Sequence, residues 1–174
     1  MANFAGRPLR AMHSSWHSVN VATLIMRAAL GVGFVAHGGQ KLFGWFGGGG
    51  ITGTTAFFRT VGLPSPHVCA YVAGIAEFAG GIAIGLGFLT IVAALGLLAE
   101  MVIAVMTVSF SAGFFVTAQK IGWELNLYLI GLLGALLVMG PGAWSVDAAL
   151  GLTRRSAAAA AVPARSGGQA GAPV

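Results

Sequence analysis

Three ionisable side chains interrupt long apolar stretches of this sequence. Arg27 lies in the first stretch, and Glu77 and Glu100 lie in two later ones. An ionisable group in such surroundings is destabilising unless it has a partner or a function. One basic and two acidic groups predict a buried, charge-paired cluster in which one carboxyl holds a proton, because two unpaired carboxylates repel in a dry site. Two interpretations fit: a site that handles protons or a polar ligand, and a cluster that only holds helices in register.

A second set of polar residues is expected near one membrane surface, as an outer polar mouth. It consists of His37, Gln40 and Lys41 at the end of the first apolar stretch, and Glu124, Asn126 and Tyr128 at the start of the last one. An ion pair between Lys41 and Glu124 is expected here. These side chains either reach from the apolar layer towards water or bind a small ligand such as a quinone head group. In the second case His37 and Lys41 donate hydrogen bonds to its carbonyl oxygens.

Other kinds of chemistry find less support. Cys69 is the single cysteine, so no internal disulfide, C-x-x-C pair or cysteine metal site can form, and dithiol chemistry requires a partner protein. No metal site is expected. A bis-histidine haem on His37 and His67 is disfavoured, because a lone histidine is more often simply hydrogen-bonded. The glycines at 47–50 lack the following helix with Lys and Ser or Thr that a phosphate loop requires. No dense basic face indicates nucleic-acid binding.

The composition defines the class of protein. Hydrophobic residues make up 57% of the 174 residues and charged residues only 7%, whereas a soluble domain carries about a quarter charged residues. So few charges cannot cover a water-exposed surface, so the sequence predicts an all-α integral membrane protein. With a net charge of +5, anionic lipid head groups are the expected acidic neighbours.

Four apolar segments are long enough to predict transmembrane helices. They cover about 19–42, 68–88, 90–114 and 123–140. Together they predict a four-helix bundle within a domain at 19–152. A short helix or interfacial segment is expected over 52–61, before two prolines. A last short helix is expected with Ser145 as its N-cap and Asp147 in its first turn.

The flanking segments give an expected orientation. Residues 1–18 are interpreted as a poorly ordered cytoplasmic arm and 153–174 as a disordered tail. Four spans place both termini on one side, and the larger number of arginines on that side predicts that it is cytoplasmic. A signal peptide is the weaker interpretation of the first stretch, because Arg27 lies inside it and no small-x-small cleavage site ends it.

Several short motifs in order resemble the DoxX family of small four-helix bacterial membrane proteins, over about Thr23 to Leu150. They are Arg27-Ala-Ala-Leu-Gly31, His37-Gly-Gly-Gln-Lys41-Leu-Phe, Gly62-Leu-Pro64, Glu77-Phe-Ala-Gly-Gly81, Trp123-Glu-Leu-Asn126-Leu and Gly140-Pro-Gly-Ala-Trp-Ser145-Val-Asp147. Residues that fall on family-type positions are Arg27, His37, Lys41, Glu77, Glu124 and Asn126. Glu100 is less clearly part of that set.

The resemblance implies a multi-pass protein of the bacterial inner (plasma) membrane. Some relatives belong to quinone-linked oxidoreductases, including thiosulfate:quinone oxidoreductase, and others are tied to oxidative stress. It therefore implies a subunit or accessory of such a system, with quinone as ligand, no covalent cofactor, and a soluble redox partner protein besides lipid. The alternative is a non-enzymatic scaffold, assembly factor or small-solute conduit, in which Arg27 and Glu77 are structural.

Overall fold

The fold is entirely helical over the part of the chain that can be described. The computed structural model describes residues 8–153, with side chains from residue 17 onward, and this part contains helices and no strand. The all-α prediction is confirmed. The first seven residues of the expected arm, and the expected tail after Thr153, lie outside the described residues.

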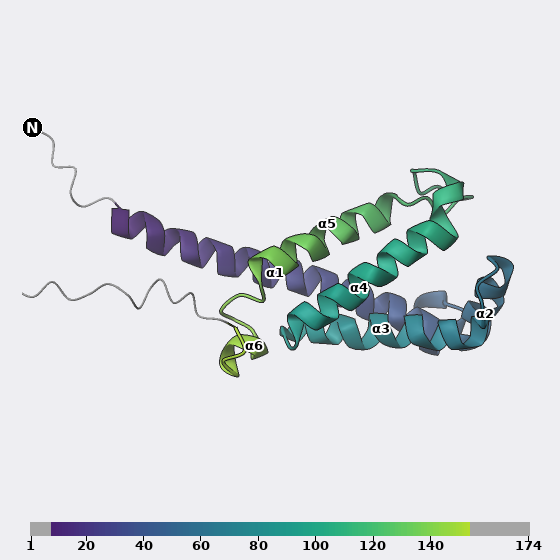
Figure 1. Ribbon diagram of the computed structural model, residues 1–174, viewed down its shortest axis with the longest axis horizontal. Helices are drawn as coiled ribbons and strands as arrows, with labels where there is room; N and C mark the ends of the chain where they lie inside the picture. Colours follow the sequence, from purple (N-terminus) through teal and green to yellow (C-terminus); the bar gives the residue numbers. More distant parts are fainter. Residues whose placement is uncertain (1–7, 154–174) are drawn as a thin grey trace, which may run out of the picture.

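Six α-helices follow one another along the chain (Figure 1). They are α1 (Pro8–Phe43), α2 (Gly50–Thr60), α3 (Pro66–Leu86), α4 (Thr90–Ala104), α5 (Glu124–Met139) and α6 (Val146–Ala149). A single 3-10 turn, η1 (Trp45–Gly47), separates α1 from α2. After Ala104 the chain continues through a π-helical segment, η2 (Val105–Ser109), and a 3-10 turn, η3 (Phe110–Ala112).

The first helix begins earlier than the sequence predicted. Residues 8–18, expected as part of a poorly ordered arm, form the first turns of α1. Pro8 is well suited to a first helical position, since its missing N–H has no partner there in any helix. No glycine or further proline interrupts the chain between Pro8 and Val19. The change from polar to apolar residues near Val19 therefore does not mark the start of the helix.

Three helical segments are long and apolar enough to cross a membrane, judged by length and composition. They are His17–Phe43, Pro66–Leu86 and Thr90–Ala112. The fourth expected span, α5, is apolar but has only 16 residues, or roughly 24 Å of helix. A typical hydrocarbon core is about 30 Å thick. The multi-pass membrane class is therefore supported, and the fourth crossing remains a prediction.

Figure 1 shows four helices, α1, α3, α4 and α5, running along the long axis of the molecule. The start of α1 and the short α6 lie at one end, while α2 and the connection from α4 to α5 lie at the other. Helix α3 ends and α4 begins at their shared turn, and the two helices separate towards the α2 end.

Glycines bring α1 and α3 into close antiparallel contact. A Cβ placed on Gly38 would lie 2.4 Å from the backbone nitrogen of Phe78, and one on Gly31 would lie 2.9 Å from the Cα of Gly85. A Cβ on Gly81 would lie 2.7 Å from the backbone nitrogen of Val35. Small residues allow helices in membranes to approach this closely. These contacts fix the register of the two helices, and that register decides which polar residues meet.

Helices α4 and α5 pack with α1 and α3 and complete the hydrophobic core. The core consists of Leu30, Phe34, Ile84, Ala94, Leu97, Met101, Leu133 and Leu136. It draws on all four long helices, so α5 packs as part of the same body whether or not it crosses the bilayer completely.

Candidate functional site

A partly buried ion pair joins α1 to α3. The Lys41 ammonium, in the last turn of α1, donates a hydrogen bond to Oε2 of Glu77, in the middle of α3. The Glu77 side chain is 5% exposed and that of Lys41 25%. Gly74 makes the pair possible, because a Cβ there would lie 2.7 Å from Leu42 and 3.4 Å from the Cβ of Lys41. Lys41 therefore lies against α3 at Gly74, about one turn before Glu77.

Glu100 on α4 is the third ionisable group at this level. The charges of both Glu77 and Lys41 act on it. Its Oε2 atom is buried, and no group among the described residues makes a hydrogen bond with that atom. Two carboxyl groups and one ammonium thus share one region. We refer to these three residues as the Lys41–Glu77–Glu100 site.

Arg27 does not join this site, so the predicted cluster of Arg27 with Glu77 and Glu100 is wrong in its basic member. Its guanidinium donates four hydrogen bonds to backbone carbonyls. The acceptors are the oxygens of Ile84 (3.0 Å), Gly85 (3.0 Å), Pro141 (2.7 Å) and Trp144 (2.9 Å).

The register of the helices explains this difference. Ile84 lies seven residues after Glu77, or roughly 10 Å further along the α3 axis. Arg27 lies one turn before Gly31, which is opposite Gly85 of α3, so Arg27 lies just beyond the end of α3 and its guanidinium reaches back to the Ile84 carbonyl. Its hydrogen bonds go to carbonyls of the last turn of α3, where partners within the helix run out.

Asp147 on α6 completes this structural cluster. Its carboxylate accepts hydrogen bonds from the backbone N–H groups of Leu89 (2.7 Å) and Thr90 (2.9 Å), and so caps α4. Burial acts to raise the pKa of the Asp147 carboxyl, but hydrogen bonds from Thr90 and Leu89 and the charge of Arg27 outweigh it. The pKa is therefore held below its ordinary value.

Sequence reasoning found the place of Asp147 but not its role. The expected N-cap at Ser145 is confirmed, since its Oγ accepts a hydrogen bond from the backbone N–H of Ala148 at 3.1 Å. The Asp147 side chain, however, turns away to cap α4. One signal was available: Phe88 and Leu89, which precede α4, have no capping side chain, so its first amides required an acceptor from elsewhere.

The expected outer polar mouth is divided into separate groups. Lys41 pairs with Glu77 instead of Glu124, so the predicted Lys41–Glu124 ion pair is wrong. Glu124 accepts hydrogen bonds from the Tyr128 hydroxyl and from the backbone N–H of Val116, both at 3.4 Å. These partners lie on α5 and on the connection before it, which explains why Glu124 is drawn away from α1.

The remaining members of the expected mouth also lie apart. The Asn126 amide donates a hydrogen bond to the sulfur of Met101 on α4 at 3.5 Å. His37, one turn before Lys41, is exposed, and Gln40 is half-buried. A Cβ placed on Gly48 would lie 2.8 Å from the Cβ of Gln40. Among the six expected residues, Lys41 is thus the one that joins the ion pair.

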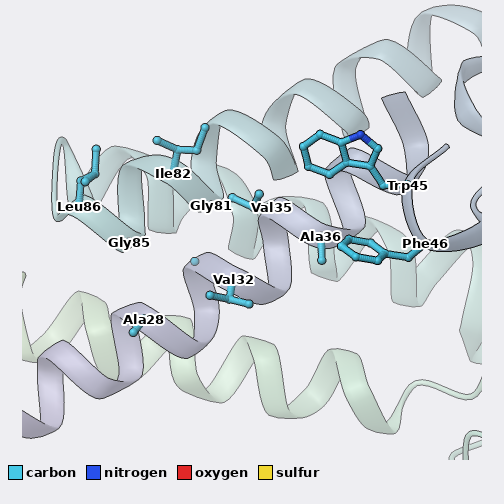
Figure 2. A pocket seen from close by; sticks show the side chains of 11 residues that line it. Ala28, Val32, Val35, Ala36, Trp45, Phe46, Gly81, Ile82, Gly85 and Leu86 are labelled. Carbon is cyan, nitrogen blue, oxygen red and sulfur yellow. The ribbon is translucent and has the colours of Figure 1, made fainter. Parts of the chain in front are cut away.

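Two hollows lie elsewhere on the molecule. Figure 2 shows a groove of about 430 Å³ between α1 and α3, with Trp45 and Phe46 at one end. Its lining carries no charged side chain, which suits hydrocarbon. A larger hollow of about 970 Å³ at the α6 end includes Asn20 and Asp147 in its lining. Both side chains already accept hydrogen bonds from backbone amides. Asn20 accepts from Ala143, and Asp147 accepts from Leu89 and Thr90.

Comparison with known proteins agrees with the motifs. The sequence profile of the DoxX family matches residues 22–110. The chain belongs to the DoxX family. It is 31% identical over 102 residues to a Bacillus subtilis (strain 168) protein named "Putative oxidoreductase CatD", and the aligned region covers 59% of this chain and 70% of that protein. No solved structure matches the chain.

The region that matches the DoxX profile contains both Arg27 and the Lys41–Glu77–Glu100 site. Arg27, Lys41, Glu77 and Glu100 lie within 22–110, whereas Asp147 lies beyond it. In this DoxX chain Arg27 makes four hydrogen bonds to backbone carbonyls with its five N–H donors. The Lys41–Glu77–Glu100 site is therefore the place where a buried charge and an unpartnered acid oxygen are available for chemistry.

Proposed function

We propose that this DoxX chain is a subunit or accessory of a quinone-linked oxidoreductase in the bacterial inner membrane, and that the quinone head group binds at the Lys41–Glu77–Glu100 site. The observation that carries this proposal is the Lys41–Glu77 ion pair, buried among apolar helices beside a free oxygen of Glu100. The name of the Bacillus subtilis relative supports the broader class of oxidoreductase.

The chemistry of the site fits a carbonyl ligand. An ammonium has three donors, and that of Lys41 makes one hydrogen bond, to Glu77. A partly exposed donor remains to bind a quinone oxygen. A positive charge at this place also stabilises the negative charge that develops on the oxygen during reduction. The isoprenoid tail lies in the surrounding lipid, along the exposed apolar faces of the helices.

Electrons come from a second protein in this proposal. Conversion of a quinone to a hydroquinone takes two electrons and two protons. The single cysteine, Cys69, cannot form a dithiol by itself. A soluble redox protein is therefore the expected electron donor, and the DoxX chain binds and orients the quinone.

The proposal is tested by titrating a short-chain quinone into the purified full-length protein in detergent, with tryptophan fluorescence and thermal unfolding as readouts. A bound quinone raises the unfolding temperature, and above its Kd the rise grows with the logarithm of the quinone concentration. The test variant is the double substitution Lys41→Met with Glu77→Leu, which removes both charges and leaves no unpaired ion. Glu124→Gln is the control. We expect at least a tenfold loss of affinity in the double variant and none in the control.

Two results contradict the proposal. Failure of the wild-type protein to bind quinone excludes the ligand. Unchanged affinity in a folded double variant places the quinone at another site.

A non-enzymatic scaffold is the second candidate, and Arg27 is the observation that favours it. All four of its hydrogen bonds go to backbone carbonyls of α3 and of the turn before α6. One intramembrane charge in this chain therefore has a structural role. If the Lys41–Glu77 pair has the same role, the double variant retains the cellular phenotype of the wild-type gene as long as it folds.

A further inference from the structure

We infer that Glu100 is the proton-exchanging residue of the Lys41–Glu77–Glu100 site: it is held as a neutral acid and delivers its proton to the bound carbonyl ligand. This inference rests on the proposed function and assigns a role within that site. The geometry that points to it is the pairing of Lys41 with Glu77, which leaves one Glu100 oxygen buried without a hydrogen bond from any described residue.

The charged and titratable groups on α1, α3 and α5 decide the charge balance, and those of Glu77 and Lys41 act on Glu100. Helix α1 contributes Lys41 and the exposed His37, and α3 contributes Glu77. Helix α5 contributes Glu124 and Tyr128, which bind each other near the connection that follows η3. Lys41 is thus the cation at this level, and its hydrogen bond goes to Glu77.

A neutral Glu100 follows from that balance. The Lys41–Glu77 pair is neutral as a unit, so an ionised Glu100 would leave one uncompensated negative charge inside the apolar bundle. Such a charge is strongly destabilising. A carboxylate also requires hydrogen-bond donors around both oxygens, whereas Oε2 has none among the described residues. Both observations favour the protonated acid.

The proton has a defined use when the ligand is reduced. In the oxidised complex the Glu100 O–H donates a hydrogen bond to a quinone oxygen. Two electrons from a reduced flavoprotein or dithiol protein convert the quinone to its hydroquinone. The Glu100 O–H bond breaks as the ligand O–H bond forms, and solvent supplies the second proton. The resulting carboxylate lies near the Lys41 ammonium, and water restores its proton before the next cycle.

The protonation state is measured directly by infrared spectroscopy of the full-length protein. A protonated carboxylic acid has a C=O band distinct from that of a carboxylate. We expect this band in the wild-type protein at neutral pH, its loss in Glu100→Gln and its retention in Glu124→Gln. Absence of the band from the wild type, or its persistence in Glu100→Gln, overturns the assignment.

Quinone titrations at several pH values test the link to the ligand. In the wild type, affinity should fall about tenfold per pH unit once Glu100 loses its proton, since one proton is linked to binding. Glu100→Gln keeps a neutral hydrogen-bond donor, so it should bind with little dependence on pH. A pH slope that persists in Glu100→Gln overturns the assignment. If the wild type shows the infrared band but binds no quinone, the quinone function fails and Glu100 remains a buried acid.

Discussion

Lys41 and Glu77 place an ammonium and a carboxylate together in a region surrounded by apolar side chains. Attraction between the two charges offsets the loss of water only while both are present. Removal of one partner leaves the other as an unpaired buried charge. The pair is therefore a sensitive point for stability, whatever ligand it binds.

Glu77→Gln should lower the free energy of unfolding by about 3 kcal/mol or more, because it leaves Lys41 without its counter-ion. Thermal or denaturant unfolding in detergent measures this change. The double substitution Lys41→Met with Glu77→Leu should recover most of the loss. Glu124→Gln, whose hydrogen bonds lie at the start of α5, should stay within about 0.5 kcal/mol of the wild type. Equal losses in Glu77→Gln and Glu124→Gln would refute the special position of the pair.

The sequence identified the ionisable residues but not their partners. Arg27, Glu77 and Glu100 are recognisable because apolar residues surround them in the chain. Their pairing depends on how far α1 is shifted along α3, and backbone contacts at Gly31 and Gly38 determine that shift. Hydropathy contains no information about this register. The predicted Lys41–Glu124 pair and the predicted place of Arg27 beside Glu77 were both wrong for that reason.

At the scale of elements, glycines bring the backbones of α1 and α3 into close contact. Gly38 and Gly33 provide a matched comparison on the same helix. A Cβ on Gly38 meets the backbone of Phe78, while one on Gly33 meets nothing within 4 Å. Backbone cannot move aside as a flexible side chain can, so the two positions should respond in opposite ways to the same substitution.

Gly38→Ala should destabilise the protein by about 1–3 kcal/mol through overpacking. Gly33→Ala should be neutral or stabilise it by up to about 1 kcal/mol, because alanine favours the helix. Unfolding in detergent measures both changes. Similar effects at the two positions would show that α1 and α3 are not in close contact at Gly38.

Asp147 should make the stability of the α3–α4 turn depend on pH. Its folded-state pKa lies below the ordinary value, so the carboxylate contributes stability above that ordinary value, about 3.9. This contribution is lost as pH falls through the folded pKa. Asp147→Asn should therefore flatten the decrease in stability below about pH 4. Unfolding temperatures from pH 3 to 6 compare the two proteins, and parallel curves would exclude this role for Asp147.

Element boundaries were predictable where the sequence itself contains a stop signal. Pro66 opens α3, and Gly87, with a φ of 69°, ends it. At the start of α1 the signal, Pro8, is followed by polar residues that favoured an unstructured arm, and η2 contains no glycine or proline to mark it. The cap of α4 also lay beyond local reasoning, since it lies 57 residues away in the chain.

For the whole molecule, composition alone predicted an all-helical membrane protein, because a chain with 7% charged residues has no other stable environment. The number of crossings is harder to derive. Helix α5 is shorter than a typical span, and the core residues Leu133 and Leu136 show only that it packs against the other helices.

Epitope tags at the two ends of the chain test the predicted four crossings. If α5 crosses the membrane, both tags lie on the same, cytoplasmic side. A protease added to sealed spheroplasts should then spare both tags, and the same protease added to inverted vesicles should remove both. Cleavage of one tag in each preparation would mean an odd number of crossings.

The cap that Asp147 provides for α4 has a consequence for biosynthesis. A ribosome releases the first turn of α4 long before it reaches the residue that completes that turn. Until then the amides of Leu89 and Thr90 lack their native acceptor, and the hairpin of α3 and α4 enters the bilayer with one end unfinished. The arrival of α6 closes that end, so a chain that terminates before Asp147 should be recognised by quality-control proteases as incomplete.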